Sequence, residues 1–380
     1  MPGITRFALA LLVCFGILHL QFGTEANLQT TSKPVSHAPL NRLELQLPAP
    51  TGPLAVATKI YTWTDHSRLE KASNNPEDFR QLVVQVWYPT DDGSGPAAPY
   101  VPMLSAYRRV WDAADLEVAA RVVTHSRWNK RPRPGMNFPV VVFSHGWQGT
   151  RSEYTSIAED LASHGYAVFG IDHPYMGRVA LPSGLVTEPT EDQFQNRAEI
   201  MDYYAKDVRF AIDAISGLNA ADPDGTFTGT LKLSRIAAIG HSSGFVAAGT
   251  ACRLDHRISA CVNLDAPGFS TSDLAGLTQP LLWVRLERAG PVPQDFLKST
   301  TSPVYELQIV GTNHGSVEDW DYLEAKTPLL RDKAAEHLRL VRKYLAAFLG
   351  TYLKDQNSEL LRQESRNSEL TFLIYRKLAQ

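Results

Sequence analysis

The feature that most constrains the fold is an alternation, beginning at residue 138, of short apolar runs with longer segments of helical periodicity. The runs are rich in β-branched residues and read FPVVVFSHG, YAVFGIDH and RIAAIGHSSG, and they are separated by EYTSIAEDLASHG and NRAEIMDYYAKDVRFAIDAI. Strands that alternate with helices pair in parallel, and the helices cover both faces of the sheet. The sequence therefore predicts an α/β fold with a mostly parallel central sheet.

The composition on either side of this alternation sets the expected domain boundaries. Two β-rich runs, 54–64 and 81–89, precede it, and the strands ISACVNLDA, PLLWVRLE and VYELQIVG follow before a long helix, LRDKAAEHLRLVRKYLAAFLGTYL. Residues 27–53 are rich in Thr, Ser, Pro and Asn without a sustained period, which is typical of a linker. We predict one domain over residues 54–353, followed by a polar tail, 354–380.

Residues 1–26 have the outline of a signal peptide. A single cation, Arg6, precedes an apolar stretch over 7–22, and small residues close the segment at Ala26. The alternative is a permanent membrane anchor, but the stretch is shorter than the roughly 20 residues that a bilayer span requires. We expect removal of this leader and a secreted or periplasmic protein.

Composition narrows the class of substrate. With 44% hydrophobic and 20% charged residues, the 380-residue chain can bury a large core. A formal net charge of -3 leaves no excess of basic side chains for a nucleic-acid surface. A neutral or lipid-like substrate fits this composition better.

Two cysteines, Cys252 and Cys261, remain once the leader is removed. An exported protein can oxidise such a pair to a disulfide. The alternative is two small buried residues that do not react. We expect the disulfide.

Residues 240–244, GHSSG, fit the pattern G-x-S-x-G with Ser242 in register. A predicted strand precedes the motif and a predicted helix follows it, as a nucleophile elbow requires. In such an elbow the serine backbone is strained and its oxygen exposed, and the residues two positions away must be small. Gly240 and Gly244 meet that requirement, so the motif favours an α/β-hydrolase fold with a serine nucleophile.

A serine hydroxyl needs a base to accept its proton, and in α/β hydrolases that histidine comes last in the chain order. Three histidines follow Ser242: His256, His314 and His337. His314 directly follows the last predicted strand, at the carboxyl edge of the sheet where sites form. We assign it as the base, and expect His256 on the far side of the sheet and His337 on the surface of the long helix.

Spacing leaves the acid open. Asp265 and Glu287 follow two consecutive predicted strands, and either can reach the carboxyl edge of the sheet.

The oxyanion formed on attack needs backbone donors. One donor is expected from the amide of Ser243 and the other from the loop over residues 144–149, in which His145 is interpreted as structural.

Three stretches, FPVVVFSHGWQGTRSEYTSIAEDLASHGY, RIAAIGHSSGF and CVNLDAPGF, resemble the platelet-activating factor acetylhydrolases of the plasma and intracellular type II kind. The resemblance implies Ser242 as nucleophile, Asp265 as acid and His314 as base, with the amides of Trp147 and Ser243 as oxyanion donors. It also implies no metal or other cofactor, and the sequence contains neither C-x-x-C nor H-E-x-x-H. The implied substrate is a phospholipid with a short or oxidised acyl group at the second glycerol position, met through transient contact with a membrane or lipid aggregate.

The sequence departs from this family next to the nucleophile. Members usually read GHSFGG, with an aromatic residue directly after the nucleophile. Here Ser243 takes that position and the aromatic residue, Phe245, comes two positions later. Trp147 also replaces a smaller aliphatic residue. These positions border the acyl pocket, so the acyl preference is not carried over. A broad short-chain esterase or polyesterase is the alternative function, and a hydrolase-fold binding protein without activity is a second one.

Residues 103–123, MLSAYRRVWDAADLEVAARVV, place apolar side chains at helical spacing. A lid helix that meets lipid is one interpretation. We favour a helix packed on the core, because any surface helix shows such a stripe.

Overall fold

The computed structural model describes residues 45–268 and 271–375. The strands are β1 (Leu45–Gln46), β2 (Ala55–Leu69), β3 (Phe79–Thr90), β4 (Ala97–Pro99), β5 (Val122–Trp128), β6 (Phe138–Ser144), β7 (Ala167–Asp172), β8 (Leu231–His241), β9 (Ile258–Leu264), β10 (Leu281–Arg285), β11 (Val304–Ile309), β12 (Ser365–Arg366) and β13 (Leu370–Ile374). The helices are α1 (Ala113–Arg121), α2 (Thr155–Ser163), α3 (Arg197–Ala221), α4 (Ser243–Leu254), α5 (Thr271–Leu274), α6 (Gln294–Ser299), α7 (Asp319–Leu323) and α8 (Pro328–Lys354). Short 3-10 helices are η1 (Leu104–Arg109), η2 (Arg151–Tyr154) and η3 (Glu359–Leu361).

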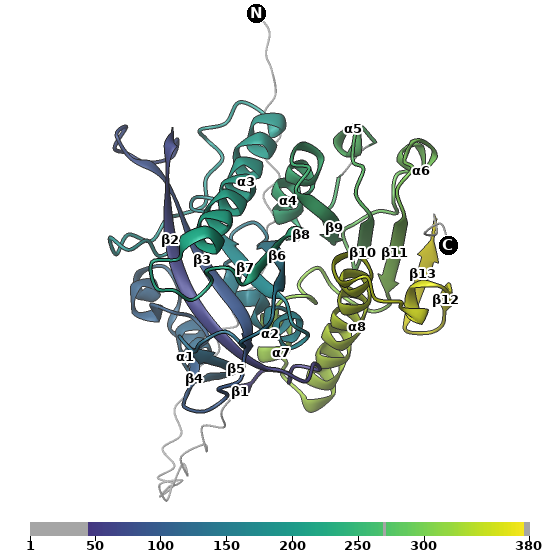
Figure 1. Ribbon diagram of the computed structural model, residues 1–380, viewed down its shortest axis with the longest axis horizontal. Coiled ribbons are helices and arrows are strands. Elements are labelled where there is room, and N and C mark those ends of the chain that lie inside the picture. The colour runs from purple at the N-terminus through teal and green to yellow at the C-terminus, as the bar shows by residue number, and fades with distance from the viewer. Residues whose placement is uncertain (1–44, 269–270, 376–380) are drawn as a thin grey trace, which may run out of the picture. The chain divides into compact units, whose positions relative to one another are not determined.

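One mixed sheet joins the strands in the order β1-β5-β2-β3-β7-β6-β8-β9-β10-β11-β13-β12, with β4 paired to β5 (Figure 1). From β7 to β11 every neighbouring pair is parallel. Antiparallel strands flank this centre, β3 beside β7 and β13 beside β11. The predicted alternation of strands and helices is confirmed, and with it the α/β fold and its mostly parallel sheet.

Helices cover both faces of the sheet, because the central strands are mostly apolar and carry buried side chains on both faces. All seven residues of β6 and all six of β7 are buried. Helices α3 and α4 contribute to a hydrophobic cluster on one face, and α2 and α8 contribute to the cluster on the other. Two faces closed in this way leave the loops at the carboxyl edge of the sheet as the accessible place for a site.

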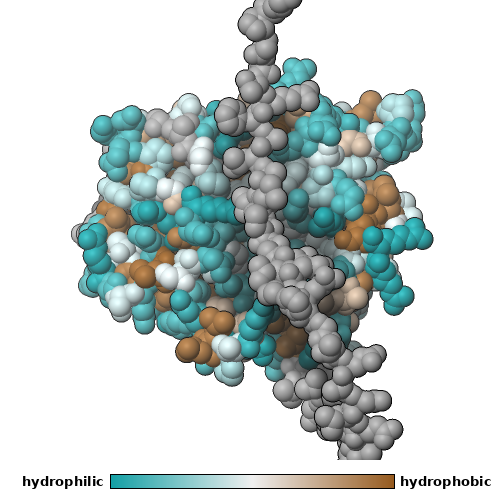
Figure 2. All heavy atoms as spheres, turned by 180° about the vertical axis from the view of Figure 1, so that it is seen from behind, coloured by the Kyte–Doolittle hydropathy of each residue, from teal (hydrophilic) through white to brown (hydrophobic). Residues whose placement is uncertain are grey.

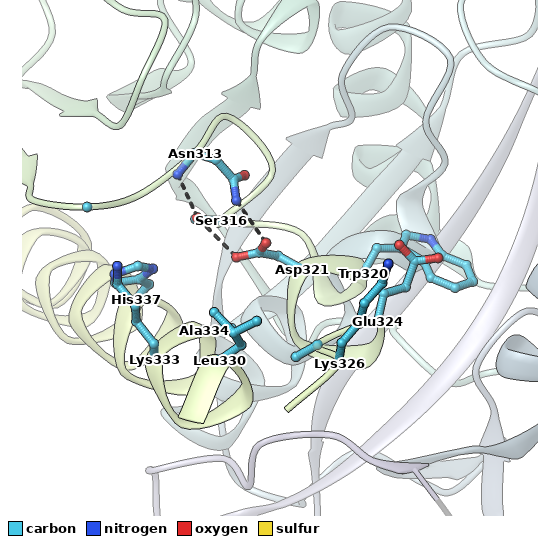
Figure 3. A pocket seen from close by; sticks show the side chains of 12 residues that line it. Asn313, Ser316, Trp320, Asp321, Glu324, Lys326, Leu330, Lys333, Ala334 and His337 are labelled. Carbon is cyan, nitrogen blue, oxygen red and sulfur yellow. Dashed lines mark hydrogen bonds between the residues drawn. The ribbon is translucent and has the colours of Figure 1, made fainter. Parts of the chain in front are cut away.

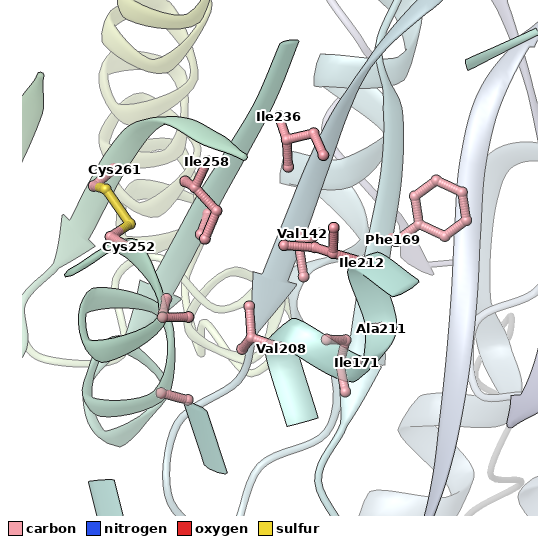
Figure 4. Packing of buried hydrophobic residues seen from close by; sticks show 14 of the residues in the cluster. Val142, Phe169, Ile171, Val208, Ala211, Ile212, Ile236, Cys252, Ile258 and Cys261 are labelled. Atoms are coloured by element: carbon pink, nitrogen blue, oxygen red, sulfur yellow. A yellow bond between two sulfur atoms is a disulfide. The ribbon is translucent and has the colours of Figure 1, made fainter. Parts of the chain in front are cut away.

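The cluster under α3 and α4 contains the disulfide. Figure 4 shows Cys252 of α4 bonded to Cys261 of β9, next to Ile258. Val208 and Ile212 of α3 pack over the neighbouring strands in the same layer. The expected pairing of the two cysteines is confirmed.

The predicted linker ends earlier than residue 53. Strand β1 pairs with β5, Leu47 is buried, and the amide of Thr51 donates to Asp160 Oδ1 at 2.7 Å. The sequence does carry a short strand signal here, because Leu43, Leu45 and Leu47 alternate with polar residues, but the Thr-, Ser- and Pro-rich composition around it masked that signal. The rest of the linker and the leader, residues 1–44, lie outside the described residues.

The sequence predicts that the domain ends at residue 353 and leaves open whether the tail after Lys354 folds, and the described part of that tail adds two strands to the sheet. After a polar loop, β12 and β13 form a hairpin, and β13 pairs with β11 from Tyr305↔Ile374 to Ile309↔Leu370. Phe372 is fully buried there. The run LTFLI is an ordinary strand signal, but the polar residues before it masked the signal at the level of composition.

The single helix expected over residues 103–123 is replaced by η1 and α1. Helix α1 begins at Ala113, after Asp112, whose side chain accepts a hydrogen bond from the Asp115 amide and caps the helix; β5 begins at Val122. Apart from the exposed Met103, the larger apolar side chains pack inward, and Trp111 lies between Tyr107 and Trp320 with ring centroids 4.8 and 6.1 Å apart. Packing on the body of the protein, the interpretation that we favoured, is confirmed.

On the part of the face in Figure 2 that grey atoms do not cover, hydrophobic side chains form small groups among hydrophilic ones. Within residues 45–268 and 271–375, no helix combines the length and apolar character that a membrane crossing requires.

Candidate active site

The motif at residues 240–244 adopts the geometry of a nucleophile elbow. Strand β8 ends at His241, α4 begins at Ser243, and Ser242 between them has φ 52° and ψ -124°. A non-glycine residue pays a steric cost at positive φ, and such strain concentrates at functional sites. The turn thus presents the Ser242 hydroxyl at the carboxyl edge of the sheet.

The two motif glycines have no room for a side chain. A Cβ on Gly240 would lie 2.3 Å from the carbonyl carbon of Gly244, and a Cβ on Gly244 would lie 2.2 Å from the carbonyl oxygen of Ser144. Both distances are far inside van der Waals contact. The requirement for small residues at these positions is therefore confirmed.

Three side chains form a hydrogen-bonded chain at this edge. Ser242 Oγ lies 2.9 Å from His314 Nε2, and His314 Nδ1 lies 2.7 Å from Asp265 Oδ2. Because an ionised carboxylate only accepts, Nδ1 carries the proton and Nε2 is free to accept the serine proton. The structure brings together the residues predicted as nucleophile, base and acid.

Asp265 is fully buried, but it is well supplied with donors. Its two oxygens accept backbone N–H groups at 2.8 to 3.3 Å from Leu286, Glu287, Arg288 and Ala289. Burial by itself raises the pKa of the Asp265 carboxyl, but the hydrogen bonds from His314 and from these amides outweigh it and lower the pKa. The carboxylate is thus ionised and can orient His314 at neutral pH.

Glu287, the alternative acid, takes a different position. Its Oε2 accepts a hydrogen bond at 3.1 Å from the backbone amide of His314, while the imidazole faces Asp265. Glu287 therefore holds the loop rather than the ring.

The two expected oxyanion donors come from the first residue of α4 and from the loop that follows β6. Ser243 is the first residue of α4, and first-turn amides have no acceptor within their own helix. The amides on either side of Trp147 are engaged, Gly146 N with Tyr154 Oη at 3.2 Å and Gln148 N with Met176 O at 2.9 Å. Trp147 and Ser243 both line one cavity of about 470 Å³.

That cavity lies on the oxyanion side of the elbow. Its apolar wall consists of Trp147, Met176, Phe194, Ile200, Tyr204 and Val246, and the polar remainder consists of Ser243 and of Glu191, Gln195, Asn196 and Arg197. No residue of the His314 loop lines it. Since the leaving group must reach His314, the cavity is suited to the acyl side of an ester.

Sequence reasoning missed a group of side chains that joins the two catalytic loops. His241, the variable residue of the motif, lies 3.0 Å from the carbonyl oxygen of His314 through Nε2 and 2.8 Å from Tyr154 Oη through Nδ1. Tyr154 in turn accepts from Gly146. Nothing in the pattern G-x-S-x-G marks its second residue for this role.

The two rejected histidines lie away from Ser242. His256 is exposed and follows α4, at the edge of the sheet opposite the elbow. His337 was expected on the surface, but this prediction is wrong, because its side chain is only 7% exposed. It turns inward from α8 toward the loop after β11.

His337 lines a second cavity, of about 360 Å³, behind the His314 loop (Figure 3). Asp321 of α7 reaches across to that loop, where it accepts from Asn313 Nδ2 at 2.9 Å and from Ser316 Oγ at 3.1 Å. These bonds brace the residues on both sides of His314. Among the described residues, no group of three or more His, Cys, Asp or Glu side chains is arranged to hold a metal ion.

The sheet, the elbow and the order of the three side chains define an α/β hydrolase, and a model of the α/β hydrolase fold matches residues 139–362. Residues 44–210 match the family model described as platelet-activating factor acetylhydrolase, isoform II. The chain therefore belongs to the α/β hydrolases, and over residues 44–210 it is similar to the platelet-activating factor acetylhydrolases.

Individual relatives are distant. The platelet-activating factor acetylhydrolase of Canis lupus familiaris is 27% identical over 54% of this chain and 53% of its own length. An Arthroderma benhamiae protein named "Probable 1-alkyl-2-acetylglycerophosphocholine esterase" is 29% identical over 58% of each chain. The chain thus aligns with little more than half the length of these curated relatives.

A solved structure covers more of the chain. The ferulic acid esterase of Streptomyces cinnamoneus superposes with a TM-score of 0.72 at 29% identity, over 87% of this chain and all of that one.

Proposed function

We propose that this protein is a carboxylic-ester hydrolase in which Ser242 is the catalytic nucleophile. The observation that carries the proposal is the chain from Ser242 Oγ through His314 to Asp265, at 2.9 and 2.7 Å, beside a strained elbow. This is the arrangement that activates a serine hydroxyl in acyl transfer.

In the first half of the reaction, Ser242 Oγ attacks the ester carbonyl carbon while His314 Nε2 accepts the hydroxyl proton. The negative charge that develops on the carbonyl oxygen is held by the amides of Trp147 and Ser243. His314 then gives the proton to the leaving alcohol as its bond to carbon breaks. The product is an acyl-enzyme on Ser242.

In the second half, water takes the place of the alcohol. His314 accepts a proton from the water, whose oxygen attacks the acyl carbon, and then returns it to Ser242 Oγ as the acid leaves. Asp265 stays ionised throughout and stabilises the imidazolium.

For the substrate, we propose a phospholipid with a short or oxidised acyl group at the second glycerol position. The family match and the acetylhydrolase relatives support this class. Access to such a lipid would involve transient contact with a membrane or lipid aggregate.

A broad esterase or polyesterase is the second candidate, and the cavity beside Ser243 favours it. A volume of about 470 Å³ with several aromatic walls is large for an acetyl group. The solved structure that matches most of the chain is named as a ferulic acid esterase, whose acyl group is aromatic.

For the cellular location, we propose export, with the leader removed near Ala26. The disulfide between Cys252 and Cys261 supports an oxidising compartment. The mass of the N-terminal peptide of the exported protein would test this: an intact leader contradicts it.

The experiment that tests the reaction measures acid release by the mature protein from two series. One contains phospholipids with second-position chains from acetyl upward, and the other contains simple esters with matching aliphatic and aromatic acyl groups. Ser242→Ala serves as the blank.

Turnover should disappear in Ser242→Ala, and an organophosphonate probe should label the wild type and not the variant. Normal turnover in the variant would refute the nucleophile, and an unlabelled, inactive wild type would favour the binding protein without activity. Preference for short-chain phospholipids supports the first substrate class. Faster cleavage of simple or aromatic esters supports the second.

A further inference from the structure

The orientation of one oxyanion donor is fixed by the carbonyl group that shares its peptide. The Trp147 N–H and the Gly146 C=O belong to one planar unit, and in a trans peptide these two bonds point in opposite directions. A group that holds the Gly146 oxygen therefore also sets the direction of the Trp147 N–H.

The Gly146 oxygen is held by the side chain of the preceding residue. His145 Nδ1 lies 2.7 Å from it, and the Gly149 amide donates to it at 3.2 Å. His145 is completely buried, so its ring has no access to substrate. It contacts the carbonyl group of the peptide whose N–H, that of Trp147, is the proposed oxyanion donor.

The partners of His145 determine which ring nitrogen carries the proton. The backbone amide of His173 can only donate, and it lies 3.0 Å from His145 Nε2, so Nε2 accepts. A carbonyl oxygen can only accept, so Nδ1–H donates to Gly146. Burial, and after it the neighbouring His173, lower the pKa of His145 to about 3, which keeps the ring neutral.

The residue that donates to His145 is itself firmly placed. His173 Nδ1 lies 2.9 Å from Asp207 Oδ2, and its Nε2 lies 3.1 Å from Ser144 Oγ. Arg80 donates to both oxygens of Asp207, at 3.1 and 2.5 Å. Ser144, His173 and Asp207 thus form a second hydrogen-bonded chain of Ser, His and Asp. All three side chains are fully buried, so this chain supports the loop and contacts no substrate.

We propose that His145 is a positioning residue that holds the Gly146 carbonyl through Nδ1–H and thereby aims the Trp147 amide at the oxyanion, with His173 and Asp207 fixing the ring from behind. The inference rests on the proposed function, since it concerns the same oxyanion. A donor aimed in advance stabilises the developing charge without reorganisation during the reaction. A hydrogen bond to the carbonyl also polarises the peptide and strengthens its N–H as a donor.

The test compares two variants of similar polarity. In His145→Asn, the side-chain amide can place an N–H donor where Nδ1 stood. In His145→Gln, the longer side chain can place its oxygen where Nε2 stood and still accept from His173, but it offers Gly146 no donor. The readouts are kcat and KM on one simple ester, together with the affinity for a trifluoromethyl ketone, which forms a tetrahedral oxyanion on Ser242.

We expect His145→Gln to lower kcat on the order of 10- to 100-fold with KM little changed, less than the roughly 10²–10³ that loss of a whole donor costs. Affinity for the ketone should fall by a similar factor. His145→Asn should recover most of both. The loss should be the same at every pH from 6 to 9, because a neutral ring with one tautomer exchanges no proton in the reaction.

The control is His125→Gln, at a partly buried histidine whose Nε2 contacts the Leu47 carbonyl, and it should leave kcat unchanged. The proposal is overturned if His145→Gln keeps kcat within twofold of the wild type, or if Asn and Gln lose equally while both retain the wild-type melting temperature. Activity that survives in Ser242→Ala would overturn the proposed function instead, so the two failures are distinguishable.

Discussion

At the scale of single residues, hydrogen bonds decide which of two carboxylates, Asp265 or Glu287, can act as the acid. Asp265 has φ 51° and no exposed surface, and the amides that follow β10 all converge on its carboxylate. Glu287 is one of those amide donors, and its own side chain accepts a hydrogen bond from the His314 backbone amide. The choice of acid thus follows from how one loop wraps around one carboxylate.

Asp265→Asn should therefore cost far more activity than Glu287→Gln. An amide at 265 can donate to His314 Nδ1 and favour the wrong tautomer, for which a loss of about 10⁴ in kcat is typical. Gln at 287 retains an oxygen to accept from the His314 amide, so we expect less than a tenfold loss. Steady-state kinetics of the two variants on one ester measure the difference, and the reverse order would make Glu287 the acid.

At the scale of elements, the C-terminal hairpin supports the strand that leads to the base. Strand β13 lies antiparallel to β11, which ends at Ile309, five residues before His314. Phe372 packs against Tyr305 of β11 and Tyr344 of α8, with ring centroids 6.0 and 4.8 Å apart. The last strand of the sheet thus belongs to the packed core.

Phe372→Ala should lower the free energy of unfolding by about 3–5 kcal/mol, the usual cost of removing a buried phenyl ring. Denaturant titration measures the loss. Leu329→Ala is the control, because Leu329 in the first turn of α8 is 77% exposed and should change stability by less than about 0.5 kcal/mol. Equal effects in the two variants would show that the hairpin contributes little to stability.

At the scale of the whole molecule, one buried carboxyl makes stability depend on pH. Asp319, at the start of α7, is fully buried, and burial raises its pKa to about 7, although its two oxygens accept from the Ser156 amide. The folded state thus keeps a proton here that the unfolded chain, with a pKa near 3.8, releases. Between these two values, folding binds the proton, so this group's contribution to stability falls as the pH rises.

Asp319→Asn should remove that decline. Since each pKa unit corresponds to about 1.4 kcal/mol, the wild type should lose up to a few kcal/mol more than the variant between pH 4 and pH 8. Urea unfolding of both proteins across this range measures the difference. Parallel stability curves would show that Asp319 titrates in the folded state as it does in the unfolded chain.

The disulfide stabilises the fold by lowering the conformational entropy of the unfolded chain. It joins two residues nine positions apart, and closing a loop of this size corresponds to roughly 2–3 kcal/mol in the chain-entropy model. The double variant Cys252→Ala, Cys261→Ala should lose stability of that order and keep its kcat, because neither residue contacts the site. Peptide mass mapping without reductant should find the cross-link, and alkylation of both thiols in the native protein would contradict it.

The sequence by itself determined the parallel centre of the sheet, Ser242 and His314, because strand and helix periods, the elbow glycines and the order of the triad are local patterns. The family resemblance, rather than spacing, favoured Asp265 over Glu287, since both follow strands to the same edge. Only the tertiary structure decided that residues 45–53 and the last hairpin join the domain, that His337 is buried, and that His241 links Tyr154 to the His314 loop. These features depend on contacts between segments far apart in the chain, and no local period records such contacts.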